Sequence, residues 1–152
     1  MKYKFLLDEN VIYHAIQRRD KFNNFDLTAA KLLVLIAKNC HSIVIDSTLW
    51  KSYHKILARL KSEKSDFVKM IMHIHLLLSN SEKSMTDFQT LPELTDETIY
   101  PRKDIYVVRA AYHFSAVIVT SDSDLTEAIN IMEHASVKAL HPEKALKLAR
   151  ET

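Results

Sequence analysis

The chain has 152 residues, enough for one domain with a substantial core. Hydrophobic residues make up 47% of it and charged residues 26%, and a net charge of +2 is too small to indicate nucleic-acid binding by itself. Glycine is absent, which excludes the glycine-rich phosphate loops of nucleotide-binding folds and leaves Asn, Asp and Ser for turns that need a positive φ.

The cysteine count and the hydropathy pattern bear on the compartment. The one cysteine, Cys40, excludes an internal disulfide and fits a reducing environment. The apolar start of the chain is too short for a signal peptide, and no apolar run is long enough for a membrane helix. We therefore expect a cytoplasmic protein with no membrane partner.

Short, continuously apolar segments alternate along the chain with longer segments of helical periodicity. The expected strands are residues 4–8, 42–46, a short one near 84–88, 116–120 and 136–140. The expected helices are residues 9–19, 27–39 with Asp26 as its N-cap, 48–60, 65–79, 103–114, 123–134 and 142–150. This order is typical of a three-layer α/β/α fold with a central parallel sheet, here as a single domain over residues 1–152.

Acidic residues stand where the expected strands end. Asp8 ends the first strand, and Asp122 and Asp124 follow the strand 116–120. Asp104 opens the helix that leads into that same strand. Functional residues of parallel sheets gather at the carboxyl ends of the strands, where carboxylates repel one another unless a cation or a proton lies among them. Hard oxygen ligands suit Mg²⁺ or Mn²⁺, although each Asp could equally cap the helix that follows it.

Three motifs contain these acids: "LLDENV" (6–11), "KDIYVVRAA" (103–111) and "IVTSDSDL" (118–125). Together they resemble the PIN domain, a family of metal-dependent ribonucleases that includes many toxins of toxin–antitoxin pairs. The matching positions are Asp8, Asn10, Asp104, Val107, Val108, Ala111, Thr120, Asp122, Asp124 and Leu125. The resemblance runs from residue 4 to about residue 148 and is weak between residues 70 and 98.

The resemblance implies an endoribonuclease that depends on Mg²⁺ or Mn²⁺ and cleaves RNA phosphodiesters. Asp8, Asp104 and Asp122 would hold the ion, and Asp124 would be a further ligand, orient a water or cap the next helix. Asn10 would orient a carboxylate, and Thr120 or Ser121 would hydrogen-bond a phosphate or a water, although capping explains these three residues as well. The family also implies an antitoxin partner and a homodimer.

One position departs from the family pattern. The family carries a Glu in the helix after the second strand, and the corresponding residue here is Ser52, with no acid anywhere from residue 47 to 62. The site would then bind its cation more weakly, recruit Glu9 or an acid of "ELTDE" (93–97), or use His54 as a base. Alternatively, catalysis is lost, and the chain is a PIN-like module that binds RNA or protein.

Basic residues near these motifs would suit an RNA backbone. Lys51, Lys55 and Arg59 recur at every fourth position of the helix that carries Ser52, and Arg102 and Lys103 precede Asp104. Arg18, Arg19 and Lys21, at the end of the first helix, could also meet phosphate. The alternative for each group is an ordinary solvated helix face or helix end.

A phosphotransfer receiver domain is a third reading of a doubly wound sheet with strand-end acids. It requires an acceptor Asp at the end of the third strand and a Lys after the last strand. Neither is clear, because Lys138 falls inside the expected strand 136–140.

Overall fold

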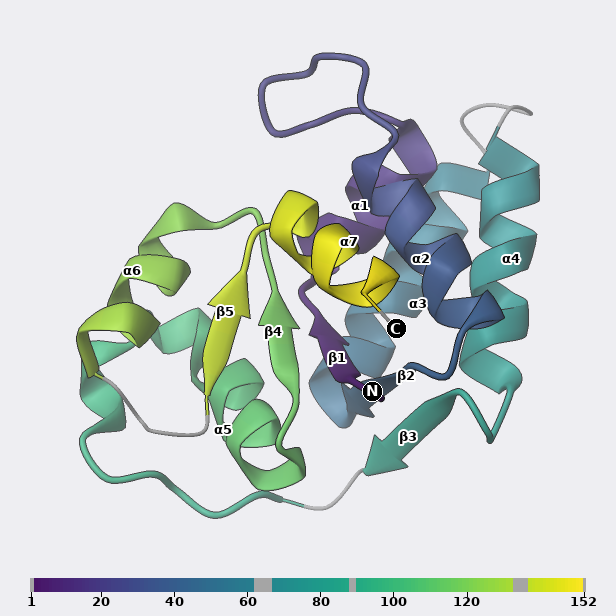
Figure 1. The fold of residues 1–152 in the computed structure, drawn as a ribbon. Helices are drawn as coiled ribbons and strands as arrows, with labels where there is room; N and C mark the ends of the chain where they lie inside the picture. Colours follow the sequence, from purple (N-terminus) through teal and green to yellow (C-terminus); the bar gives the residue numbers. More distant parts are fainter. Residues whose placement is uncertain (1, 62–66, 88–89, 133–136, 152) are drawn as a thin grey trace.

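Five parallel strands form one sheet in the order β3-β2-β1-β4-β5 in the computed structural model (Figure 1). The structure describes residues 2–61, 67–87, 90–132 and 137–151. The strands are β1 (Lys4–Leu7), β2 (Ser42–Asp46), β3 (Ser84–Asp87), β4 (Val117–Val119) and β5 (Lys138–Leu140). The order reverses at β1, whose neighbours are β2 and β4. Ligands of open parallel sheets bind beyond the carboxyl ends of the strands at such a reversal.

The helices lie in two groups on the two faces of the sheet (Figure 1). They are α1 (Glu9–Gln17), α2 (Thr28–Lys38), α3 (Ser47–Lys61), α4 (Val68–Ser79), α5 (Ile105–Phe114), α6 (Ser123–Met132) and α7 (Pro142–Arg150). Helix α5 contacts β1, β2 and β4, and α6 contacts β5, whereas α1, α2, α3, α4 and α7 contact one another. This three-layer α/β/α arrangement confirms the expected fold class.

The central strands are buried on both faces, as their continuously apolar sequence indicates. Phe5, Leu6 and Leu7 of β1 are fully buried, and the segment 43–45 of β2 is at most 1% exposed. Burying each such side chain contributes about 1.5–3 kcal/mol to folding. The core therefore fixes the strands whose carboxyl ends carry the acids.

Several predicted boundaries shift at their ends. Strand β1 stops at Leu7, because Asp8 is already the N-cap of α1, and β4 and β5 contain only three residues each. A short 3-10 turn, η3 (Arg102–Asp104), replaces the predicted first turn of α5. The prediction that Asp26 is the N-cap of this helix is wrong, because the N-cap of α2 is Leu27. Asp26 lies one residue earlier, and its Oδ1 accepts from the backbone N–H of Thr28 at 2.8 Å. Parts of the predicted helices 65–79 and 123–134 and of the predicted strands 84–88 and 136–140 lie outside the described residues.

Turns of positive φ are made without glycine, as the composition requires. In the described part of the chain, three of them use the expected residue types, at Asn23, Asp96 and Ser115. The fourth is Arg18, the C-cap of α1, with φ 58°. Among the helices that the structure describes, none combines the length and apolar composition that a membrane crossing requires.

Candidate functional site

Asp8 lies at the point where the strand order reverses, and its carboxylate is held by three donors. Its Oδ1 accepts from the backbone N–H of Glu9 at 2.9 Å. Its Oδ2 accepts from the Thr120 hydroxyl at 2.8 Å and from the Asn10 amide at 3.1 Å. Burial raises the pKa of Asp8, and the hydrogen bonds from Thr120 and Glu9 oppose that rise. Asp8 is thus both a helix cap and a fixed carboxylate at the carboxyl edge of the sheet.

Thr120 and Asn10 connect Asp8 with the segment that follows β4. The Thr120 hydroxyl donates to Asp8 and accepts from the backbone N–H of Asp122 at 3.0 Å. Asn10 donates to Thr120 Oγ1 at 3.4 Å, and its Oδ1 accepts from the backbone N–H of Ser121 at 3.3 Å. Through these contacts Asn10 and Thr120 both orient the Asp8 carboxylate, the role that the sequence suggested for Asn10. They also fix the two acidic segments relative to one another.

Asp104 is buried at 6% exposure, and its Oδ2 is a buried oxygen with no hydrogen-bond partner among the described residues. Burial and the negative charges of Asp8 and Asp122 together raise the pKa of Asp104 to about 6, against the opposing Lys103. Asp104 therefore lies within electrostatic reach of both other acids. A buried carboxylate without a partner beside like charges is stabilised by a proton or by a cation.

Asp122 and Asp124 have different surroundings. Asp122 Oδ1 accepts from the backbone N–H groups of Asp124, at 2.9 Å, and of Leu125, at 3.4 Å, and so caps α6. Its Oδ2 lies 3.9 Å from Lys103 Nζ. Asp124 is exposed on the first turn of α6, and only its backbone N–H takes part in this network. The structure thus brings Asp8, Asp104 and Asp122 together and leaves the Asp124 side chain at the surface.

Three further residues belong to this edge of the sheet. Asp46 ends β2, is 7% exposed and caps α3 by accepting from the backbone N–H of Leu49 at 2.8 Å. Burial raises the pKa of the Tyr106 hydroxyl, and the charges of Asp8, Glu9, Asp46 and Asp104 raise it further, so this hydroxyl lies among four acids. The buried Tyr53 hydroxyl donates to the carbonyl of Leu7. An acid closing the apolar "SIVID" was the sequence signal for Asp46, whereas the two tyrosines carry no such signal.

Replacing Tyr53 with Phe tests how firmly this edge is built. The variant leaves the buried carbonyl of Leu7, next to Asp8, without its donor, so we expect the free energy of unfolding to fall by about 1–2 kcal/mol. Urea unfolding measures the change. Tyr112, which is 48% exposed, supplies the matched control, since Tyr112→Phe should leave stability within about 0.5 kcal/mol. Equal losses in the two variants would contradict a specific role for the Tyr53 hydroxyl.

Ser52 lies in a hollow of about 480 Å³ between α1 and α3. The lining residues are Glu9, Asn10, Tyr13, His14, Ser52, Lys55, Ile56 and Arg59. Glu9 is therefore an acid that shares this hollow with the position of the missing Glu. Arg59 places its guanidinium carbon 5.3 Å from the centre of the Tyr13 ring.

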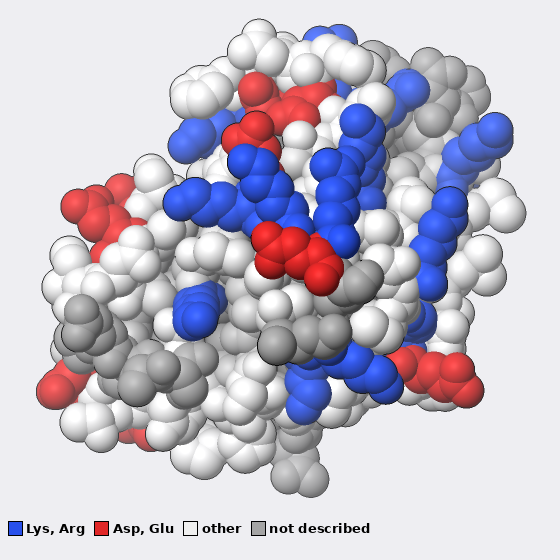
Figure 2. All heavy atoms as spheres, in the orientation of Figure 1, with Lys and Arg blue, Asp and Glu red and all other residues white. Residues whose placement is uncertain are grey.

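The basic residues of α3, Lys51, Lys55 and Arg59, do not all face the hollow that contains Ser52. Lys55 and Arg59 line the hollow with Ser52, whereas Lys51 is exposed and lies outside its lining. Arg102 and Lys103 are exposed at the start of η3. Figure 2 shows Lys and Arg side chains over the face formed by α2 and α7 as well, with acidic side chains among them. Positive charge alone therefore does not locate an RNA-binding surface.

Two of the alternatives for the missing Glu find no support in the geometry. His54 packs against Trp50, with ring centres 4.5 Å apart, and against His75 at 6.0 Å, and it does not line the hollow of Ser52. Glu97 of the "ELTDE" segment accepts from Arg109 Nε at 2.9 Å, and Arg109 holds the pKa of Glu97 at about 2. Glu97 is thus held by Arg109, whereas the buried Nε2 of His54 has no hydrogen-bond partner among the described residues.

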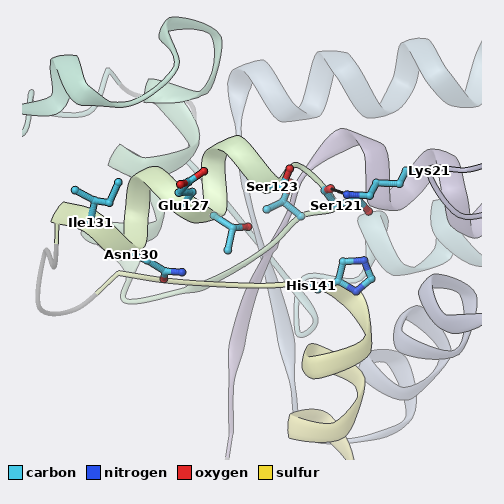
Figure 3. A pocket seen from close by; sticks show the side chains of 9 residues that line it. Lys21, Ser121, Ser123, Glu127, Asn130, Ile131 and His141 are labelled. Carbon is cyan, nitrogen blue, oxygen red and sulfur yellow. Dashed lines mark hydrogen bonds between the residues drawn. The ribbon is translucent and has the colours of Figure 1, made fainter.

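A second hollow, of about 530 Å³, lies on the other side of the Asn10–Ser121 contact (Figure 3). The lining residues are Lys21, Thr120, Ser121, Ser123, Thr126, Glu127, Asn130, Ile131 and His141. Figure 3 shows the Lys21 side chain reaching Ser121, where its Nζ lies 3.5 Å from the Ser121 carbonyl oxygen. The segment 120–121 thus borders this hollow, and Asn10 borders the hollow that contains Ser52.

The donor set fits a hard divalent cation in its chemistry. Asp8, Asp104 and Asp122 supply carboxylate oxygens, and one of these, Asp104 Oδ2, is buried with no partner in the described part of the chain. Within residues 2–61, 67–87, 90–132 and 137–151, however, no three acidic, His or Cys side chains already stand in a metal-holding group. Binding would therefore require these acids to rearrange.

No family model matches this chain in a scan of protein families, and a search of the curated proteins finds no match. The indications of function in this chain are therefore the geometry at the carboxyl edge of the sheet and the three motifs.

Proposed function

We propose that this protein is a divalent-metal-dependent endoribonuclease of the PIN type. The observation that carries the proposal is the buried Asp104 Oδ2, which has no partner in the described chain and lies beside Asp8 and Asp122. Catalytic sites of parallel sheets occur at such a reversal of strand order. The three motifs of the PIN domain fall on the same residues.

Asp8, Asp104 and Asp122 would hold Mg²⁺ or Mn²⁺ in this proposal. The ion, when bound, supplies Lewis-acid stabilisation of phosphoryl oxygens and lowers the pKa of a water. Thr120 and Asn10 keep the Asp8 carboxylate in place, and the cap that Asp122 makes on α6 orients its second oxygen outward from the helix. Lys55 and Arg59, in the hollow beside Asn10, are placed to bind the RNA backbone.

Further partners enter the proposal through the family resemblance. An antitoxin protein that inhibits the enzyme and a second copy of the chain in a homodimer are both typical of the PIN toxins. A cytoplasmic location is part of the same proposal, because an RNA substrate is met there.

A non-catalytic RNA-binding module is the second candidate, and specific observations favour it. Ser52 stands where the family carries an acid, and Lys103 already lies 3.9 Å from Asp122. A lysine can neutralise part of the acidic charge that a cation would otherwise offset. The basic hollow of Lys55 and Arg59 would serve this candidate equally well.

The deciding experiment is cleavage of a pool of structured RNAs by the purified protein with Mg²⁺, Mn²⁺ or EDTA. We expect cleavage with either metal, none in EDTA, and a loss of roughly 100-fold in Asp122→Asn. Asn keeps an Oδ1 acceptor for the cap of α6, so the variant should fold normally. Glu143→Gln, which removes an exposed charge in the first turn of α7, is the control and should cleave normally. Absence of cleavage by folded protein with every metal would favour the second candidate.

A further inference from the structure

The loop between α1 and α2, residues 18–27, exposes two aromatic rings. Phe22 is 72% exposed and Phe25 is 66% exposed, among the largest values for large hydrophobic residues in the described chain. Figure 1 shows this loop standing out beyond the carboxyl ends of the strands. Neither ring contributes to the buried core. Two exposed rings on one loop are more than the scattered single apolar residues of an ordinary surface.

The loop backbone is closely held, so the rings are presented by an ordered support. Asp20 Oδ1 accepts from the backbone N–H groups of Phe22 and Asn24, both at 2.9 Å. The backbone N–H of Asp20 donates to the Asn24 carbonyl at 2.9 Å, and Arg19 pairs with Phe25 in an antiparallel bridge. Asn23 makes the turn at φ 64°. An ordered loop loses little conformational entropy when a ligand binds.

The tip of the loop contacts the candidate site. Lys21 Nζ lies 5.3 Å from the centre of the Phe22 ring and 3.5 Å from the carbonyl oxygen of Ser121 (Figure 3). The backbone N–H of Ser121 donates to Asn10, which in turn donates to Asp8. A continuous series of contacts thus joins Phe22 to the acids at the sheet edge.

The loop carries three basic and two acidic residues, which gives it a net charge of +1. Asp20 and Asp26 both accept backbone N–H groups, at 2.9 and 2.8 Å, and so are occupied in shaping the loop. Arg18, Arg19 and Lys21 are exposed, and they form no ion pair with a carboxylate in the part of the chain that the structure describes. Aromatic rings among outward-facing cations are typical of surfaces that stack nucleic-acid bases and bind their phosphates.

We propose that residues 18–27 form a stacking arm for single-stranded RNA, with Phe22 and Phe25 receiving bases and Lys21 and Arg19 receiving phosphates. The inference rests on the proposed function, because RNA is taken as the ligand of the adjacent site. Single strands are favoured because stacking on a side chain requires a base face that a duplex keeps covered. The arm would guide an unpaired segment toward Asp8 past Ser121.

The test measures binding of a fluorescein-labelled RNA of about 12 nucleotides, single-stranded or in a matched duplex, by fluorescence anisotropy in EDTA. We expect the single strand to bind more tightly than the duplex to the wild-type protein. Phe22→Ala and Phe25→Ala should each weaken single-strand binding by roughly 5- to 100-fold, and Phe22→Trp should restore it, because Trp also stacks. Duplex binding should change little in these variants.

Leu76→Ala is the matched control, since Leu76 of α4 is 69% exposed and lies outside the loop. Single-strand affinity that is equal in Phe22→Ala, Phe25→Ala and Leu76→Ala would overturn the proposal. The proposal would also be overturned if the wild-type protein self-associated and Phe22→Ala were monomeric with unchanged RNA affinity. That result would make the loop a protein contact.

The EDTA condition separates this inference from the nuclease proposal. Loop-dependent binding without cleavage in any metal would support the stacking arm and remove the nuclease. Metal-dependent cleavage that is unaffected in the Phe22→Ala and Phe25→Ala double variant, with unchanged binding, would support the nuclease and remove the arm.

Discussion

Asp104→Asn is expected to make the protein more stable above pH 6 and to reduce metal-dependent cleavage strongly. The folded protein keeps a proton on Asp104 up to about pH 6, because burial and the neighbouring acids raise its pKa from the ordinary value of 3.8. The unfolded chain releases the same proton near pH 4. The free energy of unfolding of the wild type therefore falls as the pH rises from about 4 to about 6 and stays lower above that range.

Asparagine resembles the protonated carboxyl group and does not ionise, so the variant avoids this loss. The gain at pH 8 should be on the order of 2–3 kcal/mol and should disappear at pH 4, as measured by urea unfolding at both pH values. Mg²⁺ should raise the melting temperature of the wild type and have a much smaller effect on the variant, and cleavage should fall roughly 100-fold.

Asp26→Asn supplies a contrast of opposite sign. The hydrogen bonds from Thr28 lower the pKa of Asp26, so that carboxylate stabilises the fold above the unfolded pKa. Its replacement should lower stability at neutral pH, and the difference should shrink as the pH falls through the lowered pKa. If the stability difference between Asp104→Asn and the wild type were the same at pH 4 and pH 8, Asp104 would not have a raised pKa. If Mg²⁺ raised the melting temperature of the variant as much as that of the wild type, Asp104 would not bind the cation.

Ser52→Glu is expected to strengthen the response to divalent metal. Ser52 is half-buried beside Glu9 and Asn10, so a carboxylate there would be added to the acidic edge of the sheet. In EDTA, repulsion from Glu9 should lower the melting temperature, although Lys55 in the same hollow offsets part of that repulsion. With Mg²⁺ or Mn²⁺ the loss should be reversed, and the metal concentration for half-maximal cleavage should fall on the order of tenfold.

Ser52→Gln is the matched control for this variant, since it adds nearly the same volume without the charge. Thermal unfolding and cleavage are measured for both variants over a metal titration. If the wild type proves inactive, cleavage that appears in Ser52→Glu and is absent from Ser52→Gln would identify the missing acid as the cause. Identical metal dependence of the two variants would show that position 52 does not face the cation.

Asp8 and Asp122 could be predicted because each follows an apolar segment, and Asp104 because it opens the helix that leads into the strand before Asp122. An apolar strand that closes on Asp8, or a strand followed by Asp122, indicates a position at the sheet edge whatever the remaining structure is. The surroundings of Asp124 could not be predicted in this way. Whether it turns inward depends on how α6 begins, and the cap made by Asp122 directs the Asp124 side chain to the surface.

The remaining features depend on contacts between distant segments. Tyr106 reaches the acids because α5 packs across β1, β2 and β4, and periodicity within α5 does not specify that packing. The exposure of Phe22 and Phe25 likewise could not be predicted from the sequence, because an aromatic residue is normally expected in the core. The sequence alone shows that Ser52 departs from the family pattern. Its neighbours Glu9 and Asn10 could not be predicted, because they depend on the packing of α1 against α3.

The contact between Thr120 and Asp8 has a consequence for the time at which the site can exist. The two residues are 112 positions apart, and β1 gains its neighbour β4 only through that same long-range pairing. Pairings of this kind form late, because the entropy cost of closing a long loop must be met before the contacts can stabilise the chain. A chain still emerging from the ribosome therefore carries Asp8 without the Thr120 donor, and without Asp104 and Asp122, until most of the protein has been made. An RNA-cleaving activity built in this way would stay silent in incomplete chains beside the very RNA that encodes them.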